Sequence, residues 1–378
     1  MGPSAQTQMR RGPVIVAVSI ITLVYFLLRS SLDISSPTIH NTSQPVDLST
    51  DSSILSFQSD TARKLQRIFP YEPALHRKYP RQIWQTWKYS LSDARFSSKF
   101  HRAADSWTIN NPGYAHEVLD DDSAAALIRQ LYAPVPEVVD AYFSMPKPIL
   151  RADFFRYLIL LARGGTYSDI DTTSLRGVDK WFASALSGIT TEDGSDRKIL
   201  KLSQQELDDY TKRVESGTGL IVGIEADPDR PDWNEWYARR VQFCQWTILS
   251  KKGHPVLTRI VSRITTETLR RKAINTLTLP TTKDAGSQIM DWTGPGIWTD
   301  SIFDYLASIK PGTTWKNVTA LSKAKIIGDV MILPITSFSP GVGTMGAENP
   351  DHLHAFVQHI FEGSWKPESE RQIGGGGG

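Results

Sequence analysis

Residues 150–171, LRADFFRYLILLARGGTYSDID, constrain the fold of this chain more than any other segment. The apolar residues of its first part fall at helical spacing on one stripe, which consists of Leu150, Phe154, Tyr157, Leu158 and Leu161. The pair Gly164-Gly165 predicts the end of this helix, because glycine adopts positive φ readily. A helix that leads directly into a strand is typical of an α/β domain, in which helices pack against a central sheet.

Two carboxylates follow this turn. Residues 166–171 alternate, so we expect a strand on which Tyr167, Asp169 and Asp171 point to one face. Carboxylates two residues apart at a strand end repel each other unless a cation neutralises them. Mg²⁺ or Mn²⁺ would bind them together with a substrate diphosphate. The alternative is a solvated pair of carboxylates at the end of the strand, without a metal.

Asp153 and Arg156 stand three residues apart on the predicted helix. One interpretation is a surface ion pair that contributes little stability. The other is a functional pair, in which the carboxylate accepts hydrogen bonds from sugar hydroxyls and the guanidinium binds the sugar or a phosphate. The spacing alone does not choose between these interpretations.

The composition excludes several classes of protein. The chain of 378 residues carries 42 Lys and Arg against 40 Asp and Glu, and a net charge of +2 argues against a nucleic-acid binder. Cys244 is the one cysteine, which excludes an internal disulfide framework and a multi-cysteine zinc or iron–sulfur site. We expect Cys244 to be a buried free thiol.

The N-terminal region predicts a membrane anchor. Residues 14–28 are almost wholly apolar and are bracketed by arginines. We therefore predict a cytoplasmic tail over 1–13 and one short transmembrane helix over 14–29, which suits the thinner membranes of the early secretory pathway. The basic residues ahead of the span place the rest of the chain in the lumen, a type II topology. A cleaved signal peptide is the alternative, although no small-residue cleavage site follows Leu28 promptly.

Three further parts follow the anchor. Residues 30–62 are rich in Ser, Thr, Asp and Pro and predict an extended lumenal stem. Residues 63–367 have the alternating apolar runs and amphipathic segments of an α/β catalytic domain. Residues 368–378 form a glycine-rich tail that we expect to be flexible. Asn41 and Asn317 begin glycosylation tripeptides that would be used only in a lumenal chain.

Several elements of the catalytic domain can be predicted individually. We expect strands over 81–87 and 116–119. A helix should follow the second strand, with N-cap side chains from 120–123, and continue through Leu131. A third, buried strand is predicted over 220–224, directly before Glu225 and Asp227.

The pattern R-x-D-x-x-R-Y-x-x-L-x-x-x-G-G-x-Y-x-D-x-D, residues 151–171, resembles the nucleotide-sugar site of the family 32 glycosyltransferases. Further blocks are similar to the fungal members of that family that initiate α-1,6-mannose chains: 81–88, 223–227, 245–247, 253–255, 293–295, 332–340 and 359–366. The resemblance spans roughly residues 80–365. It implies an α/β fold of the GT-A type, with a Rossmann-like nucleotide half joined to an acceptor half.

The resemblance also implies roles for individual residues. Asp169 and Asp171 would hold Mn²⁺, or Mg²⁺ as the alternative ion, on the diphosphate of GDP-mannose, and His359 would be a further metal ligand. Glu225 lies in a region that resembles the acceptor side and is a candidate nucleophile or base. The implied donor-binding residues are Trp84, Gln85, Thr86, Asp153, Arg156, Tyr167, Gly363, Ser364, Trp365 and Lys366. Trp84 fits a place in the core equally well.

The implied reaction transfers mannose from GDP-mannose to an N-glycan core in α-1,6 linkage with retention of configuration. Three alternatives stay open: an inositol phosphorylceramide acceptor, a UDP-sugar donor, and a non-catalytic lumenal subunit of a mannosyltransferase complex. The resemblance further implies that the protein lies in the Golgi membrane as a type II protein with its catalytic domain in the lumen, where subunits of such a complex are candidate partners.

Overall fold

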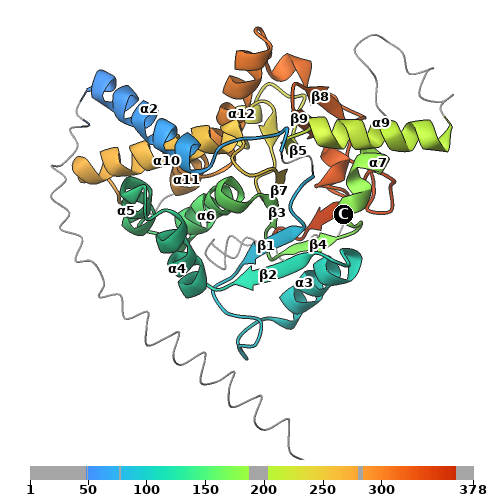
Figure 1. Cartoon of the computed structure of the whole chain (residues 1–378), viewed down its shortest axis with the longest axis horizontal. Helices are drawn as coiled ribbons and strands as arrows, with labels where there is room; N and C mark the ends of the chain where they lie inside the picture. Colours follow the sequence, from blue (N-terminus) through green and yellow to red (C-terminus); the bar gives the residue numbers. More distant parts are fainter. Residues whose placement is uncertain (1–47, 49, 76–77, 187–202, 280–283, 363–378) are drawn as a thin grey trace, which may run out of the picture. The chain divides into compact units, whose positions relative to one another are not determined.

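The computed structural model describes residues 48, 50–75, 78–186, 203–279 and 284–362 (Figure 1). The predicted tail over 1–13, the anchor over 14–29 and the C-terminal tail lie outside the described residues. Within the described residues, no helix has both the length and the apolar character that a membrane span requires. The compact unit that contains the described elements begins at Leu48.

A mixed sheet of eight strands forms the centre of this unit, in the order β2-β1-β3-β7-β5-β9-β8, and β6 pairs with β5. The strands are β1 (Gln82–Thr86), β2 (Ala115–Leu119), β3 (Gly165–Ser168), β5 (Leu220–Ala226), β6 (Gln242–Phe243), β7 (Thr247–Ser250), β8 (Lys325–Ile327) and β9 (Val330–Leu333). A separate antiparallel pair joins β4 (Thr172–Ser174) to β10 (Val357–His359).

Strand direction places the functional edge of the sheet. β1 is parallel to β3, and β5 is parallel to β9. β7 lies between β3 and β5 and is antiparallel to both, so β1, β3, β5 and β9 all run the same way. Their carboxyl ends therefore meet at one edge, where open α/β sheets bind ligands.

Helices cover both faces of the sheet (Figure 1). They are α2 (Asp51–Ile68), α3 (Ser98–Asn110), α4 (Asp121–Leu131), α5 (Pro136–Ser144), α6 (Pro148–Arg163), α7 (Trp181–Leu186), α9 (Gln204–Gly217), α10 (Pro255–Ala273), α11 (Asp284–Trp292) and α12 (Pro295–Ile309). The strands alternate between two apolar clusters. Leu220 and Val222 of β5 pack in the cluster that contains α6 and α10, whereas Ile221 packs in the cluster that contains α7. A sheet buried on both faces is the arrangement expected of an α/β domain.

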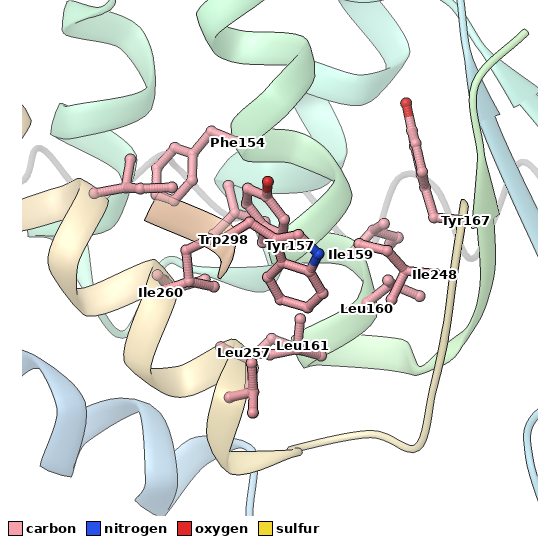
Figure 2. Packing of buried hydrophobic residues seen from close by; sticks show 14 of the residues in the cluster. Phe154, Tyr157, Ile159, Leu160, Leu161, Tyr167, Ile248, Leu257, Ile260 and Trp298 are labelled. Carbon is pink, nitrogen blue, oxygen red and sulfur yellow. The ribbon is translucent and has the colours of Figure 1, made fainter. Parts of the chain in front are cut away.

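Helix α6 confirms the prediction over 150–163 in its extent but not in its exposure. Pro148 occupies the first turn, and Gly164 ends the helix with φ 68°. All residues from Asp153 to Ala162 are buried, so the predicted one-sided stripe is wrong. Figure 2 shows the reason: α6 lies between the sheet and α10, with Leu257 and Ile260 of α10 against it.

The double glycine after α6 is required by close packing. Gly164 and Gly165 both have positive φ, and a Cβ on Gly165 would lie 2.6 Å from the backbone oxygen of Gln82. A Cβ on Gly164 would lie 2.7 Å from the backbone nitrogen of Lys252. Contacts this short cannot exist, so a side chain at either position would push β3 away from its neighbours.

Three predicted elements are confirmed to within a residue at each end. β1 covers 82–86, β2 covers 115–119, and α4 ends at Leu131 as predicted. The side chain of Asp120 accepts a hydrogen bond of 2.8 Å from the backbone N–H of Ser123, which is the predicted N-cap.

Three predicted boundaries are wrong. The extended stem predicted over 30–62 is wrong for 51–62, because these residues belong to helix α2 and this helix buries Leu65 in the main apolar cluster. The strand predicted over 166–171 ends at Ser168, and the two aspartates lie on the turn that follows. The strand predicted over 220–224 continues to Ala226 and therefore contains Glu225.

Candidate active site

A cavity of about 380 Å³ lies at the carboxyl edge of the sheet. Its walls come from the ends of β1, β3 and β5, from α6 and α11, and from β10. Its lining includes most of the residues that the sequence marked as functional: Thr86, Asp153, Arg156, Tyr167, Asp169, Asp171, Glu225 and His359. Thr86 and His359, which are 273 residues apart in the sequence, therefore meet in one place.

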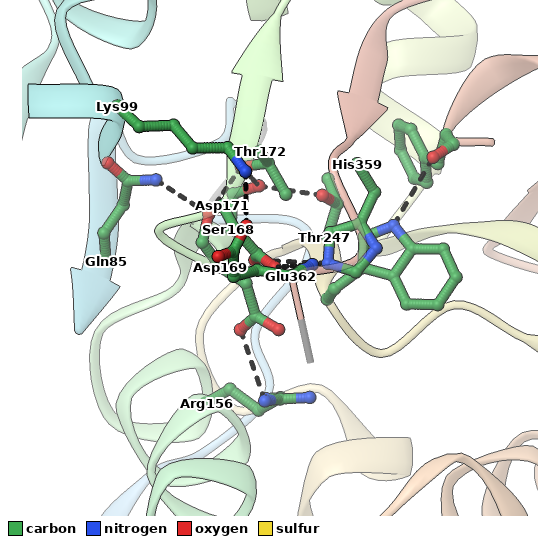
Figure 3. Close-up of polar contacts among 12 residues, drawn as sticks. Gln85, Lys99, Arg156, Ser168, Asp169, Asp171, Thr172, Thr247, His359 and Glu362 are labelled. Carbon is green, nitrogen blue, oxygen red and sulfur yellow. Dashed lines mark hydrogen bonds and ion pairs between the residues drawn. The ribbon is translucent and has the colours of Figure 1, made fainter. Parts of the chain in front are cut away.

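The centre of this cavity is a cluster of three side chains that could hold a metal ion. Asp169, Asp171 and His359 each offer a ligand atom, and these atoms lie within 4.8 Å of one another. Pairing of β10 with β4 places His359 opposite Thr172, one residue after the second aspartate. His359 Nε2 lies 3.1 Å from Asp171 Oδ1, and the backbone N–H of Glu362 donates to Asp171 Oδ2 (Figure 3).

The turn that carries the aspartates is held by its backbone. The carbonyl oxygen of Asp169 accepts hydrogen bonds from Gln85 Nε2 at 3.0 Å and from Thr172 Oγ1 at 2.6 Å. The backbone N–H of Asp169 donates to the carbonyl of Trp246 at 2.8 Å. Hydroxyl groups from Ser168 and Thr172 meet at 2.8 Å beneath the turn (Figure 3). The turn is thus fixed on several sides, which leaves the two carboxylates free to point into the cavity.

His359 is oriented by aromatic rings. Trp246 stacks on its imidazole with ring centroids 4.6 Å apart and an interplanar angle of 8°. Phe361 meets the imidazole edge at 4.2 Å and 77°. Its Nδ1 is buried and has no hydrogen-bond partner among the described residues. A buried, oriented and unpartnered imidazole nitrogen is a ready metal ligand.

The charges of the cluster are coupled. Burial works against ionisation of Asp171, but the neighbouring His359 holds the pKa of that carboxyl below its usual range. Burial likewise opposes a charge on His359, whose pKa is nevertheless raised by Asp171. Burial raises the pKa of Asp169, with Arg156 acting in the opposite direction.

These donors fit a divalent cation. Carboxylate oxygens are the ligands that Mg²⁺ and Mn²⁺ take, and an imidazole nitrogen favours a transition-metal ion over Mg²⁺. A cation bound between the two carboxylates would relieve their repulsion, and a nitrogen of His359 could serve as a further ligand. The cluster therefore fits a divalent cation.

Asp153 and Arg156 form a buried ion pair, so the surface-pair interpretation is wrong. Their side chains are 2% and 4% exposed, and Arg156 Nη2 lies 3.0 Å from Asp153 Oδ1. The same nitrogen lies 3.2 Å from Asp169 Oδ1, which links the pair to the metal cluster. Thr293 donates to the other oxygen of Asp153 at 2.9 Å, and burial raises the pKa of this carboxyl to about 6.

Two nitrogens of the Arg156 guanidinium have no hydrogen-bond acceptor among the described residues. Its Nε and Nη1 are buried and lack hydrogen-bond partners within the part of the chain that the structure describes. An unpaired buried N–H of a charged group is costly, because the group has given up water without a replacement. Since Arg156 lines the cavity, its free N–H groups are available to an anionic or hydroxyl-rich ligand there.

Glu225 lies inside β5 and turns its carboxylate toward the cavity. Its Oε2 is buried without a partner in the described residues. Burial raises the pKa of Glu225 to about 7, although a hydrogen bond from Gln242 works against the rise. A carboxyl group of this pKa exchanges a proton near neutral pH, as a general acid or base must.

Asp227 differs from Glu225 although only two residues separate them. Arg240 Nη1 lies 2.6 Å from its Oδ1, and the hydroxyl of Thr319 donates to both of its oxygens at 2.9 Å. The backbone N–H of Ala320 donates to it as well. Every oxygen of Asp227 is therefore occupied, and it holds two loops together.

The predicted donor-binding residues are spread over several environments. Thr86 and Tyr167 line the cavity, and their hydroxyls lie 3.2 Å apart. Trp84 belongs to the core, where its indole N–H donates to the carbonyl of Gly164 at 3.0 Å. Gln85 is buried beneath the turn rather than in the cavity. The remaining four, at 363–366, lie outside the described residues.

The structure adds residues to which the sequence assigned no role. Gln245 lines the cavity, accepts a hydrogen bond of 2.7 Å from Tyr157 and approaches Asp153. Trp246 stacks on His359, and Thr293 holds Asp153. The blocks 245–247 and 293–295 were visible as resemblances, but nothing in their composition indicated which carboxylate or ring they would contact.

A second cavity adjoins the first. It measures about 510 Å³ and shares Thr86 and Ala152 with the candidate active-site cavity. Its walls combine apolar rings such as Phe155 with charged side chains such as Arg151 and Asp121. The two spaces together could hold a ligand longer than a single sugar.

Comparisons with known proteins identify relatives that align with 79–83% of this chain. Residues 97–187 match the family described as a glycosyltransferase sugar-binding region containing a DXD motif. A relative named initiation-specific alpha-1,6-mannosyltransferase from Candida albicans is 43% identical over 83% of this chain and 80% of its own length. Relatives of the same name are 44% identical in Schizosaccharomyces pombe, covering 79% of this chain and 67% of that one, and 35% identical in Saccharomyces cerevisiae, covering 82% of each.

Solved structures give a weaker comparison. A glycosyltransferase called PaToxG matches 68% of this chain and 79% of its own, with 13% identity and a TM-score of 0.37. A similarity this low supports no argument about the fold of this chain beyond what its own sheet and helices establish.

Proposed function

This chain belongs to the DXD-containing glycosyltransferases that include the fungal initiation-specific α-1,6-mannosyltransferases, and we propose that it transfers mannose from GDP-mannose to an N-glycan core in α-1,6 linkage. Membership of this family makes it a glycosyltransferase. The names of three relatives support the mannose and the linkage. The donor nucleotide and the N-glycan acceptor are part of the proposal.

One observation carries the proposal: the cluster of Asp169, Asp171 and His359 shares its cavity with the unpartnered donors of Arg156. Mn²⁺, or Mg²⁺ as the alternative, bound to the cluster would neutralise the diphosphate and stabilise the charge that develops on the departing nucleotide. Asp153 then accepts hydrogen bonds from sugar hydroxyls, and Arg156 donates to the sugar or to a phosphate oxygen. A site of this kind acts mainly through electrostatic preorganisation.

We further propose that configuration is retained. In a same-face attack, the departing phosphate takes the proton of the acceptor hydroxyl, and no covalent intermediate is required. Glu225 also lines the cavity, its buried Oε2 has no hydrogen-bond partner among the described residues, and burial raises its pKa to about 7. It is placed to orient the acceptor hydroxyl or to act on the sugar.

We also propose that the fold is of the GT-A type. The parallel strands β2, β1 and β3 with α3 and α4 correspond to the nucleotide half. The adjoining cavity of about 510 Å³ is the place where we expect the nucleoside of the donor. The acceptor half then consists of the region around β5 and α12.

The location of the protein is a separate proposal. We propose a type II Golgi membrane protein with residues 14–29 as its anchor, a lumenal catalytic domain, and mannosyltransferase complex subunits as candidate partners. A protease-protection assay on sealed Golgi vesicles tests it: the catalytic domain should resist the protease until detergent is added. Digestion without detergent would reject the lumenal topology.

The main experiment measures transfer by the purified full-length protein from GDP-mannose to a Man8-type N-glycan, with Mn²⁺ and with EDTA. We expect an α-1,6-linked product that depends on Mn²⁺ and is lost in Asp171→Asn. Hydrolysis of GDP-mannose without transfer would keep the donor and reject the acceptor. Activity with UDP-sugars only, or with inositol phosphorylceramide only, would reject the donor or the acceptor respectively. A folded protein without any turnover would favour a non-catalytic subunit.

A further inference from the structure

A groove outside the candidate active-site cavity is lined by indole rings that are in contact with water. Most of the tryptophans in the core, such as Trp107 and Trp181, are completely buried. Trp233 and Trp315 line this groove, and Trp315 is 37% exposed. Trp236, which is 63% exposed, lies beside the groove against Arg230. Large apolar rings in contact with water lose the stabilisation that burial would provide, so a cluster of them marks a surface that binds something.

This indole groove is lined by Trp233, Trp315, Arg230 and Arg240, and Trp236 flanks it beside Arg230. The 3-10 helix η2 (Trp233–Glu235) puts Trp233 and Trp236 three residues apart, where side chains of a 3-10 helix lie one above the other. The guanidinium of Arg230 lies 5.7 Å from the ring centroid of Trp236, and that of Arg240 lies 4.9 Å from the ring centroid of Trp315.

The groove consists of two adjoining spaces. They measure about 460 Å³ and 700 Å³ and share Asp229, Arg240 and Trp315. The larger one reaches Ile224 of β5, the residue directly before Glu225. Since successive residues of a strand point to opposite faces, Glu225 faces the candidate active-site cavity while Ile224 faces the indole groove.

The segment between the two sites is rigidly tied to both. The side-chain oxygen of Gln242 accepts a hydrogen bond from the backbone N–H of Ala238 at 3.0 Å, and Gln242 also hydrogen-bonds to Glu225. Arg239 forms ion pairs with Asp291 of α11 and Asp300 of α12. Because α11 lines the candidate active-site cavity, a ligand bound in the groove would be held at a fixed position relative to that cavity.

The chemistry of the groove fits a neutral, hydroxyl-rich ligand. Arg230 is paired bidentately with Asp232, and Arg240 is paired with Asp227, so neither arginine is left to attract an anion. Asp229, 3.8 Å from Arg240, has a fully exposed side chain that can accept hydrogen bonds from hydroxyl groups. Flat indole rings beside carboxylate and guanidinium groups offer both a stacking surface and hydrogen bonds to a pyranose ring.

We propose that the indole groove binds mannose residues of the acceptor glycan that are remote from the reacting one, and thereby selects a large branched glycan over a short mannoside. This inference rests on the proposed function, because it assumes a glycan acceptor. Remote binding of this kind lowers KM for the large acceptor and does not touch the donor site.

The test compares Trp236→Ala and Trp315→Ala with the wild type in the full-length protein. We expect KM for a Man8-type N-glycan to rise about tenfold in each variant, since truncation of a tryptophan that anchors a ligand typically costs this much. KM for GDP-mannose and the rate with methyl α-mannoside should stay unchanged. Trp236→Phe should recover part of the affinity, and Ile109→Ala, a change at a 74% exposed residue on α3, serves as the surface control.

A second measurement separates this inference from the proposed function. Binding of the free Man8-type glycan, without donor, is followed by saturation-transfer NMR. If the wild type binds the glycan and Trp236→Ala does not, the indole groove stands even when no transfer to that glycan is observed. Equal binding and equal KM in the folded variants and the wild type would overturn the inference.

One other occupant can be tested directly. Asn317 lies two residues after Trp315 and begins a glycosylation tripeptide, so a glycan attached there could fill the groove itself. Enzymatic removal of N-glycans from the protein would then increase the affinity of the wild type for the Man8-type glycan at least tenfold but leave Trp315→Ala unchanged. That result would overturn the acceptor assignment, and unchanged affinity in both proteins would support it.

Discussion

Glu225 and Asp329 are carboxylates with opposite surroundings, at the ends of the neighbouring parallel strands β5 and β9. Glu225 lies at the carboxyl end of β5, where one of its oxygens has no partner and burial raises its pKa to about 7. Asp329 lies just before β9, at the opposite edge of the sheet. Burial works against its ionisation, but His254, Tyr71 and Tyr305 lower its pKa to about 2. Both groups are withdrawn from water, so their partners account for the difference.

The contacts of Asp329 are complete. Tyr71 donates to its Oδ2 at 2.5 Å and Tyr305 to its Oδ1 at 2.8 Å, while His254 Nε2 lies 3.3 Å away. The candidate active-site cavity contains the same residue types, a histidine and carboxylates, yet atoms of Arg156, Glu225 and His359 have no hydrogen-bond partner among the described residues. A carboxylate whose two oxygens both accept hydrogen bonds stabilises the fold, whereas unpartnered atoms that line a cavity are available to a ligand.

The largest effect is expected from Asp169→Asn. It removes one charged ligand of the proposed metal and should lower kcat for mannose transfer about a thousandfold, because the preorganised charge at the leaving group is lost. Steady-state kinetics and a Mn²⁺ titration followed by electron paramagnetic resonance measure both consequences. Asp329→Asn is the matched control and should keep both kcat and Mn²⁺ affinity. If Asp169→Asn retains more than a tenth of kcat, the metal assignment fails.

The second effect concerns the stability of the metal-free protein at high pH. The folded pKa of Glu225, about 7, lies above its ordinary value of 4.5. Its contribution to stability is therefore complete below pH 4.5 and is lost as the pH rises through 7, at a cost of about 3 kcal/mol. Urea unfolding between pH 5 and pH 8 should show this loss in the wild type but not in Glu225→Gln. Equal slopes in the two proteins would mean that Glu225 reaches water.

The third effect has the opposite sign. The pKa of Asp329 falls from 3.8 to about 2 on folding, so its stabilisation is present above pH 4 and is lost as the pH falls through 2. Asp329→Asn should lower the free energy of unfolding at pH 7 by about 2 kcal/mol. Urea unfolding checks the value, and transfer by the folded variant should remain normal. A loss of activity without a loss of stability would show that this cluster is not merely structural.

Local signals made part of the fold predictable. Gly164, the prolines and the acidic run at 120–122 punctuate the chain, and the elements next to them are confirmed to within a residue or two. The antiparallel insertion of β7 between β3 and β5 could not be predicted, because strand order depends on contacts between distant residues. Paired residues of β3 and β7 are about 80 positions apart, and those of β5 and β7 are about 30 positions apart. The burial of every residue from Asp153 to Ala162 of α6 was missed because it also depends on contacts with distant segments.

The site was predictable only where its residues are close in the sequence. Asp169 and Asp171 were expected to share the face of a strand, and they meet instead on a turn. His359, which lies 188 residues after Asp171, became a candidate only through the family resemblance. No periodicity distinguishes Glu225, whose Oε2 has no partner among the described residues, from Asp227, whose two oxygens are both bonded. That difference depends on Arg240 and Thr319.

The smallest effect would decide the role of Gln85, which the sequence placed at the donor base. In the structure, Thr108 donates to His116 Nδ1 at 2.9 Å, and His116 Nε2 donates to Gln85 Oε1 at 2.9 Å. Burial lowers the pKa of His116 to about 4, so the ring is neutral and its single proton serves Gln85, whose amide group in turn holds the carbonyl of Asp169. Gln85→Leu should therefore lower kcat about fivefold and leave KM for GDP-mannose nearly unchanged, because loss of an orienting hydrogen bond costs about 1 kcal/mol. Steady-state kinetics separates the two roles: a rise in KM for GDP-mannose at constant kcat would return Gln85 to the donor-binding surface.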